Sequence, residues 1–245
     1  MKKVAEINLI FWIMKICATT LGETAGDLLS MTMNVGYGLS SVILLGFFVL
    51  TLVIQLRSKS YHPVIYWLVI ISTSTAGTTI SDFMDRSLGL GYATGSFILA
   101  SLLAGMLLIW YVSEKTLSVT DIRSFRPEMF YWITILISNT LGTALGDYLA
   151  DSSGLGFSGG ALLIGSLIGV TVLLYYFTSI SHVILFWIAF VLTRPFGATF
   201  GDLLTKPLEK GGLNLGTVGS SAVLAGILIV FLFVIMQKHR SPKPD

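Results

Sequence analysis

The sequence predicts an all-α integral membrane protein with eight transmembrane helices, arranged as four parallel two-helix repeats with pseudo-symmetry about the membrane normal. Three observations predict this class: 54% of the 245 residues are hydrophobic, only 11% are charged, and one pattern of tryptophan, glycine and aspartate occurs four times. A soluble domain carries about 25% charged residues, so the composition excludes a soluble enzyme. The formal net charge of +2 gives no case for nucleic-acid binding, and the single cysteine excludes an internal disulfide framework.

Eight segments are long and apolar enough to cross a bilayer, whose hydrocarbon core requires about 20 predominantly apolar residues. They are residues 7–28, 38–56, 64–84, 93–112, 129–150, 159–178, 183–205 and 219–236. Their connections are short, so we expect one membrane domain over residues 1–245 and no soluble domain. The first segment is not expected to be a cleaved signal peptide, because Lys15, Glu23 and Asp27 interrupt it.

The four repeats share one spacing. The tryptophans at the start of the odd-numbered spans each have an aspartate fifteen residues later: Trp12 and Asp27, Trp67 and Asp82, Trp132 and Asp147, Trp187 and Asp202. The predicted repeats are residues 1–60, 61–116, 126–180 and 181–240, with a polar linker over 113–128 between the two halves. Each repeat uses an even number of spans, so we expect four helical hairpins of one orientation, as in transporters built from parallel repeats. The tryptophans are expected to be interfacial anchors.

Each aspartate ends a G-x-x-x-[GS]-D segment. Small residues four positions apart let helix backbones approach closely in a membrane. We therefore expect the four odd-numbered spans to pack tightly around a common axis.

Four tandem two-helix repeats, each with a tryptophan, resemble a bacterial membrane-anchored family known chiefly as a repeat of unknown function. The resemblance covers nearly the whole chain. It implies the eight-span architecture and no particular activity.

The basic residues predict the orientation. Eight spans place both termini on one side, where ten basic residues lie, against Arg86, Lys206 and Lys210 in the loops of the other side. By the positive-inside rule we expect both termini in the cytoplasm and the chain in the bacterial inner membrane.

A polar stripe follows one face of each odd-numbered span, because residues four and eight positions before each aspartate lie near the same face. The stripes are Thr19, Glu23 and Asp27; Ser74, Thr78 and Asp82; Asn139, Thr143 and Asp147; and Arg194, Ala198 and Asp202. With Lys15 added, two cations stand against five carboxylates, a formal charge of −3 that suits a bound cation. Ionisable groups inside a membrane are costly and mark ion pathways or sites. The alternative is that each aspartate is an interfacial surface residue or a cap.

An aspartate in the last turn of a helix faces the negative end of the helix dipole. We therefore expect either that each helix breaks near the aspartate or that a cation compensates the charge. Pro195 is expected to kink its helix.

Asp27, Asp82, Asp147 and Asp202 form the predicted metal or proton site, with Glu23, Thr78 and Thr143 one turn deeper. Their hard oxygen donors suit Mg²⁺, Ca²⁺, Mn²⁺, Na⁺ or H⁺. Met31, Met33 and Met84 lie just past the aspartates, and as soft donors they would favour Mn²⁺; the alternative for them is simple packing. Lys15, Arg194 and Asn139 are predicted gating or counter-ion residues, which would release a carboxylate when substrate or a proton binds. The alternative is a fixed structural ion pair.

The expected function is transport of a cation through this carboxylate-lined centre, with a divalent metal such as Mn²⁺, or a proton, as substrate. The sequence contains no nucleotide-binding loop, so an ion gradient would supply the energy. The expected partners are the lipid bilayer and a small cation, with a homo-oligomer as an option and no nucleic acid. The alternatives are an intramembrane aspartyl enzyme, which would use two of the four aspartates, and a non-transporting sensor or scaffold.

Overall fold

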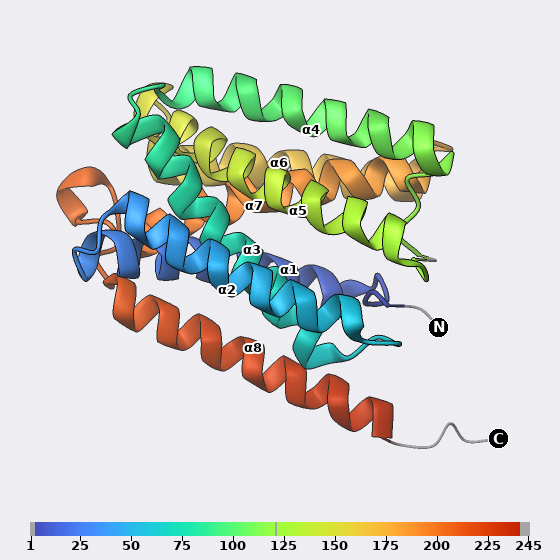
Figure 1. Cartoon of the computed structure of the whole chain (residues 1–245). Coiled ribbons are helices and arrows are strands. Elements are labelled where there is room, and N and C mark those ends of the chain that lie inside the picture. The colour runs from blue at the N-terminus through green and yellow to red at the C-terminus, as the bar shows by residue number, and fades with distance from the viewer. Residues whose placement is uncertain (1–2, 121, 241–245) are drawn as a thin grey trace.

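The computed structural model describes residues 3–120 and 122–240, and these residues form eight α-helices without a strand (Figure 1). The helices are α1 (Leu9–Asp27), α2 (Tyr37–Arg57), α3 (Pro63–Asp82), α4 (Tyr92–Glu114), α5 (Phe125–Asp147), α6 (Gly156–Phe177), α7 (His182–Thr205) and α8 (Thr217–Arg240). Each coincides with one predicted span. Seven of them, α2 to α8, are long and apolar enough to cross a membrane. Helix α1 falls short of that measure because it carries Lys15, Glu23 and Asp27.

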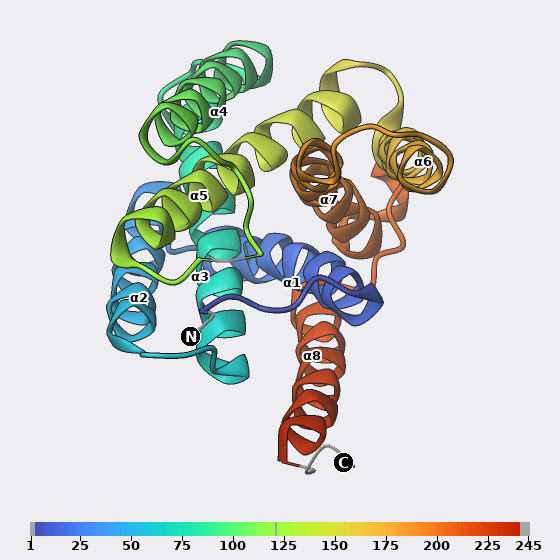
Figure 2. The ribbon, with the colours of Figure 1, turned by 90° about the vertical axis from the view of Figure 1, so that its right-hand side faces the viewer.

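The four odd-numbered helices form a closed inner ring, in which α1 and α5 each pack against both α3 and α7 (Figure 2). The even-numbered helices lie outside the ring: α2 packs on α3, α4 on α5, α6 on α7, and α8 on α1. Each even helix thus packs mainly on the odd helix of the next repeat, and α8 closes the circle on α1. The two helices of one repeat therefore do not pack on each other as the expected hairpin; each even helix packs on the inner helix of the next repeat instead.

The outer helices present apolar side chains to the surroundings. Only 22–28% of the spans in α2, α4, α6 and α8 is buried, against 61–72% in α3, α5 and α7. The exposed side chains on the outer helices are large and aliphatic or aromatic, among them Leu50, Phe97, Leu162 and Val230. A helix that is apolar on its exposed face is typical of a membrane span.

Small residues create the close helix contacts of the ring, as the G-x-x-x-[GS] spacing predicts. A Cβ atom added to one of these glycines would collide with a stripe residue of the neighbouring inner helix. The four contacts at equivalent positions are Gly22 with Ser74, Gly77 with Asn139, Gly142 with Arg194 and Gly197 with Thr19. The same glycines that bring the backbones together therefore turn the polar stripes toward the ring interior.

The winding of the inner helices changes directly after the aspartates. Single π-helical segments follow α1, α3 and α5: η1 (Leu28–Thr32), η2 (Phe83–Ser87) and η3 (Tyr148–Ser152). After α7 the chain forms a longer connection with the short 3₁₀ helix η4 (Leu208–Lys210). Helix α7 itself continues through Pro195. In three repeats, the aspartate is thus followed by one wider turn and not by a helix break, and isolated π-turns are common at functional sites.

Glycines at equivalent positions turn the chain into the even helices. Gly36, Gly91, Gly156 and Gly216 have φ between +67° and +81°, and they lie at the starts of α2, α4, α6 and α8. L-residues with a side chain rarely adopt this conformation. This common turn is a further feature that the four repeats share.

The end of the ring where the odd helices begin, here called the terminal end, is filled by aromatic side chains. Trp67, Trp132 and Trp187 are 1%, 0% and 5% exposed, and only Trp12 is half-buried. The prediction of interfacial anchors is therefore wrong for three of the four tryptophans. Closure of the helical ring packs these aromatic side chains against one another, and the ring centres of Phe11 and Trp67 lie 5.8 Å apart in a tilted arrangement.

The chain before α1 and the linker before α5 cover the terminal end. Val4, Val119 and Ile122 are buried in the same apolar cluster as the tryptophans. The Nζ atom of Lys3 lies 2.7 Å from Oε2 of Glu128, a carboxylate with no exposed surface. Helix α1 begins and helix α8 ends at this side of the bundle (Figure 1). The stripe aspartates lie toward the opposite side, where the odd-numbered helices end, here called the carboxylate end.

Candidate functional site

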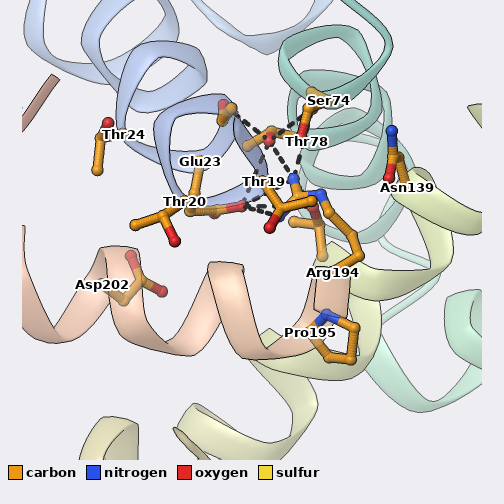
Figure 3. Close-up of polar contacts among 12 residues, drawn as sticks. Thr19, Thr20, Glu23, Thr24, Ser74, Thr78, Asn139, Arg194, Pro195 and Asp202 are labelled. Carbon is orange, nitrogen blue, oxygen red and sulfur yellow. Dashed lines mark hydrogen bonds and ion pairs between the residues drawn. The ribbon is translucent and has the colours of Figure 1, made fainter. Parts of the chain in front are cut away.

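An ion pair between Arg194 and Glu23 lies at the centre of the ring (Figure 3). Nη1 and Nη2 of Arg194, on α7, each lie 3.0 Å from Oε2 of Glu23, on α1. Both side chains are buried, at 0% and 3% exposure. The pair connects the first repeat with the last, and the predicted counter-ion role of Arg194 has a defined partner.

Thr78 and Thr143 complete this layer from the other two inner helices. Nη2 of Arg194 donates to the hydroxyl oxygens of both threonines. The threonine hydroxyls in turn lie 3.3 and 3.4 Å from Oε2 of Glu23. The predicted deeper layer of Glu23, Thr78 and Thr143 is therefore assembled in the structure, and the arginine occupies its middle.

Lys15 lies further toward the terminal end and has a different environment from Arg194. Its Nζ atom lies 3.4 Å from Oδ1 of Asn139 and 4.0 Å from the centre of the Phe190 ring. The Nδ2 atom of Asn139 donates to Thr73. Within the described part of the chain, no carboxylate lies within ion-pair distance of Lys15. Lys15 and Asn139 thus contact each other, and neither holds a carboxylate of the site.

The four aspartates lie at the carboxylate end as two pairs. In the first pair, Nζ of Lys206 lies 2.6 Å from Oδ2 of Asp27 and 3.0 Å from Oδ1 of Asp202. The two aspartates belong to the neighbouring helices α1 and α7. Burial lowers the pKa of Lys206, but the charges of Asp202 and Asp27 raise it by more, so its pKa lies above the ordinary lysine value.

The second pair has the same arrangement around an arginine. Nε of Arg86 lies 3.1 Å from Oδ1 of Asp82, and its Nη2 lies 3.0 Å from Oδ2 of Asp147. Nη1 of Arg86 donates to the hydroxyl of Tyr37. These aspartates belong to α3 and α5, so each cation bridges two neighbouring inner helices.

The contacts of Arg86 and Lys206 correct the sequence-based description of the site. Both were expected in loops, away from the stripes, yet both are bound to buried aspartates. Five carboxylates now stand against four cations, which leaves a formal charge of −1 instead of −3. The sequence contained an indication of these contacts, because Arg86 and Lys206 each follow the aspartate of their own repeat by four residues, about one helical turn. The compensating cation expected beside the aspartates is thus present in both pairs.

Three carboxylates from different inner helices lie close enough together to hold a metal ion between them. Among the described residues, one oxygen from each of Glu23, Asp147 and Asp202 lies within 4.8 Å of the others, and all three side chains are buried. They come from α1, α5 and α7. Asp27 and Asp82, although predicted as ligands, lie outside this group. A trio of carboxylate oxygens is a hard donor set, suited to Mg²⁺, Ca²⁺ or Mn²⁺.

Several oxygen atoms at the carboxylate end lack hydrogen bonds. Asp82 is 1% exposed, and neither of its carboxylate oxygens has a hydrogen-bond partner among the described residues; Oδ1 of Asp202 is in the same situation. The neighbouring cations are close, but their N–H groups are not aligned on these oxygens. Buried oxygens without hydrogen bonds are costly and can accept a ligand.

The three methionines have different surroundings. Met31 and Met33 are 39% and 62% exposed. Met84 packs against the buried cluster of Leu99, Leu103, Leu141 and Ala144, as the packing alternative predicts. The sulfur of Met31 lies 4.0 Å from Nζ of Lys206, so one of the three reaches the edge of the carboxylate site.

Comparison with known proteins identifies the repeats. Searches of curated proteins and of solved structures found no match. A family model matches four stretches of the chain, residues 10–61, 65–116, 130–181 and 185–241. Together these stretches cover most of the sequence, each with one odd and one even helix. The chain therefore belongs to the family described as Repeat of Unknown Function (DUF347).

Proposed function

We propose that this chain is an eight-span protein of the bacterial inner membrane that transports a cation through its ring of inner helices. The observation that carries the proposal is the group of Glu23, Asp147 and Asp202, whose oxygens approach within 4.8 Å inside a largely apolar bundle. Burying carboxylates in such surroundings is expensive, and the cost is offset when they bind cations. Three inner helices contribute to the group, so a bound ion would respond to movements between repeats.

The proposed orientation has both termini in the cytoplasm. It is supported by the ten basic residues on the terminal side of the sequence and by the positive-inside rule. The carboxylate end then faces outward. Pseudo-symmetry of the four repeats about the membrane normal is part of the same proposal, since each repeat contributes one inner helix in the same direction.

The proposed substrate is a divalent metal such as Mn²⁺, with a proton as coupling ion or as alternative substrate. The donors are carboxylate and hydroxyl oxygens, with Met31 at the edge of the site. The terminal end is filled by the buried side chains of Trp67 and Trp132 and by the Lys3–Glu128 pair, which supports a state closed on that side. In an alternating-access cycle, the site would be closed from one side of the membrane in such a state.

Flux into proteoliposomes tests the proposal. Purified protein would be assayed with Mn²⁺, Mg²⁺, Ca²⁺, Na⁺ and H⁺, as wild type and with all four stripe aspartates replaced by asparagine. We expect flux of at least one ion in the wild type and a loss of most of it in the variant. Asp151→Asn is the matched control, because Asp151 is exposed, lies at the same end and is outside the metal-binding group. Equal flux in the wild type and the four-aspartate variant would contradict the proposal.

One observation favours a second candidate, an intramembrane aspartyl enzyme. Oxygens of Asp147 and Asp202 lie within 4.8 Å of each other, and close carboxylates can share a proton as acid and base. In that case Asp147→Asn and Asp202→Asn would each abolish activity, and Asp27→Asn and Asp82→Asn would be tolerated. Binding of a cation without any flux would instead support a sensor or scaffold.

A further inference from the structure

The residue four positions after each stripe aspartate differs between repeats in an alternating way. These positions hold Met31, Arg86, Asp151 and Lys206. Cations therefore occur in the second and fourth repeats alone. All four repeats contain the aspartate, so two cations are shared among four aspartates.

Each of these cations joins its own aspartate to the aspartate of the next repeat around the ring. Arg86 contacts Asp82 and Asp147, and Lys206 contacts Asp202 and, across the junction of the last and first repeats, Asp27. Every stripe aspartate is thus in contact with one of the two cations. Asp147 and Asp202 of the three-carboxylate group are therefore engaged by these two cations, while Arg194 engages the third member, Glu23.

The cations approach from the edge of the site, whereas the carboxylates are buried. The side chains of Arg86 and Lys206 are 27% and 18% exposed, against 2–5% for the aspartates that they contact. Arg86 is on the π-turn η2, and Lys206 is in the connection that follows α7. Both therefore lie on segments that follow the inner helices, closer to the surface than the carboxylates that they contact.

The hydrogen bonding around Asp82 is incomplete, which is a second and independent sign that the site accepts a ligand. Both of its carboxylate oxygens are buried without a hydrogen bond, and Nε of Arg86 also lacks one among the described residues. A fixed arginine–carboxylate pair usually makes two parallel hydrogen bonds. The contact between Arg86 and Asp82 is thus electrostatic and only loosely oriented.

Charge balance indicates which kind of ion could replace the two side chains. With Arg86 and Lys206 in place, the five carboxylates and four cations leave −1. Withdrawal of both side chains would leave −3, and one divalent cation would restore −1. A monovalent ion would leave the buried site with an additional uncompensated charge, which is expensive inside a membrane.

We propose that Arg86 and Lys206 are tethered cations that occupy the carboxylate site when it is empty and leave it when one divalent cation binds. They would form the gate of the carboxylate end and compete with the transported ion for Asp147 and Asp202. This inference rests on the proposed function, and it adds the gating residues and the divalent charge of the substrate.

The first test is equilibrium binding of Mn²⁺ to detergent-purified protein, measured by titration calorimetry. Removal of the competing charges in Arg86→Gln/Lys206→Gln is expected to tighten Mn²⁺ binding about tenfold or more, in the usual range of coupling between ligands. Each single variant is expected to give part of the gain. Lys210→Gln is the matched control, because Lys210 is exposed in the same connection and should leave the affinity unchanged. Unchanged or weaker binding in the double variant would overturn the proposal.

A second measurement on the wild type keeps the proposal testable if the double variant does not fold. Acylation of Lys206 by an amine-specific reagent is followed by peptide mass spectrometry, with and without Mn²⁺. We expect Mn²⁺ to increase the labelling of Lys206 and not that of Lys210. Labelling of Lys206 that stays constant or falls at saturating Mn²⁺ would contradict displacement.

The outcomes separate this inference from the proposed function. Tighter binding in the double variant without wild-type flux would retain the competition and refute transport. Wild-type flux without tighter binding in the double variant would retain transport and refute the gate.

Discussion

Arg194 on α7 donates two hydrogen bonds to one oxygen of Glu23 on α1, although 171 positions separate the two residues in the chain. The pair joins the first and last inner helices and so closes the ring. The other three repeats have Thr78, Thr143 and Ala198 at the position of Glu23. The hydroxyls of Thr78 and Thr143 accept hydrogen bonds from the guanidinium of Arg194. The ion pair that joins the first and last inner helices thus uses a position at which the four repeats have different residues.

Breaking this pair on one side should destabilise the protein more than removing both partners. Glu23→Gln or Arg194→Gln leaves one buried charge without a partner, which typically costs about 3–5 kcal/mol. The double variant removes both charges and should recover a large part of that loss. Thermal unfolding in detergent can be followed with a thiol-reactive dye, because Cys17 is the only cysteine and is buried.

The matched control for this cycle is Arg126→Gln. Arg126 lies 3.6 Å from Glu114, but its side chain is 73% exposed. An exposed pair contributes about 0–1 kcal/mol, so the melting temperature should change little. Additive losses in the Glu23 and Arg194 double variant would show that the two side chains do not act as a pair.

The close helix contacts predict opposite effects for alanine at two helical glycines. A Cβ at Gly197 would lie 2.8 Å from the backbone carbonyl carbon of Thr19 on α1, which cannot move away without shifting the helix. Gly197→Ala is therefore expected to lose about 1–3 kcal/mol of stability through overpacking. At Gly105 in α4 no atom lies within 4 Å of the added Cβ, so Gly105→Ala should gain about 0.5–1 kcal/mol from helix propensity. Equal melting temperatures for the two variants would argue against the tight α1–α7 contact.

The cover of the terminal end depends on Glu128. Its Oε1 accepts a hydrogen bond from Gln55 at 3.0 Å, and its Oε2 binds Lys3 at 2.7 Å. Glu128→Gln removes the charge that holds Lys3, so we expect faster amide hydrogen exchange in residues 3–8 and 117–120, measured by mass spectrometry. Local opening of such a segment does not require unfolding of the helices.

Glu114→Gln serves as the control for the terminal end, because Glu114 belongs to the same linker region but forms its ion pair with the exposed Arg126. Its exchange pattern should match the wild type. If Glu128→Gln also leaves the exchange of residues 3–8 unchanged, the cover is held by apolar packing of Val4, Val119 and Ile122 alone.

Local patterns predicted a large part of the fold. The eight helices follow from hydropathy, and the glycine contacts follow from a four-residue spacing that places both small residues on one helix face. The deeper layer was also predictable, because Glu23, Thr78 and Thr143 occupy the same position in successive repeats.

Features that depend on ring closure were not predictable from local patterns. An aromatic residue such as Trp132 near the start of a span fits an interfacial anchor or a packed core equally well, and only the arrangement of the helices decides between them. The exchange of even helices between repeats is likewise a tertiary feature. Arg86 and Lys206 were assigned to loops because the predicted spans end at residues 84 and 205. In the structure, the π-turn η2 carries Arg86 onto the site, and the connection directly after α7 carries Lys206.

The environment of Lys206 predicts how its amine responds to pH. Because the charges of Asp202 and Asp27 hold its pKa above the ordinary lysine value against the opposing effect of burial, the amine stays protonated at pH 9 to 10. The contact therefore stabilises the fold throughout the range below the ordinary lysine pKa, and this contribution is lost only as the pH rises through the raised pKa. We expect an amine-acylating reagent at pH 9 to modify exposed Lys210 and to leave Lys206 largely unmodified in the absence of added metal. Asp27→Asn removes one of the two stabilising charges and should increase the labelling of Lys206, whereas Asp151→Asn should not. Rapid labelling of Lys206 in the wild type would show that it is not held between the two aspartates.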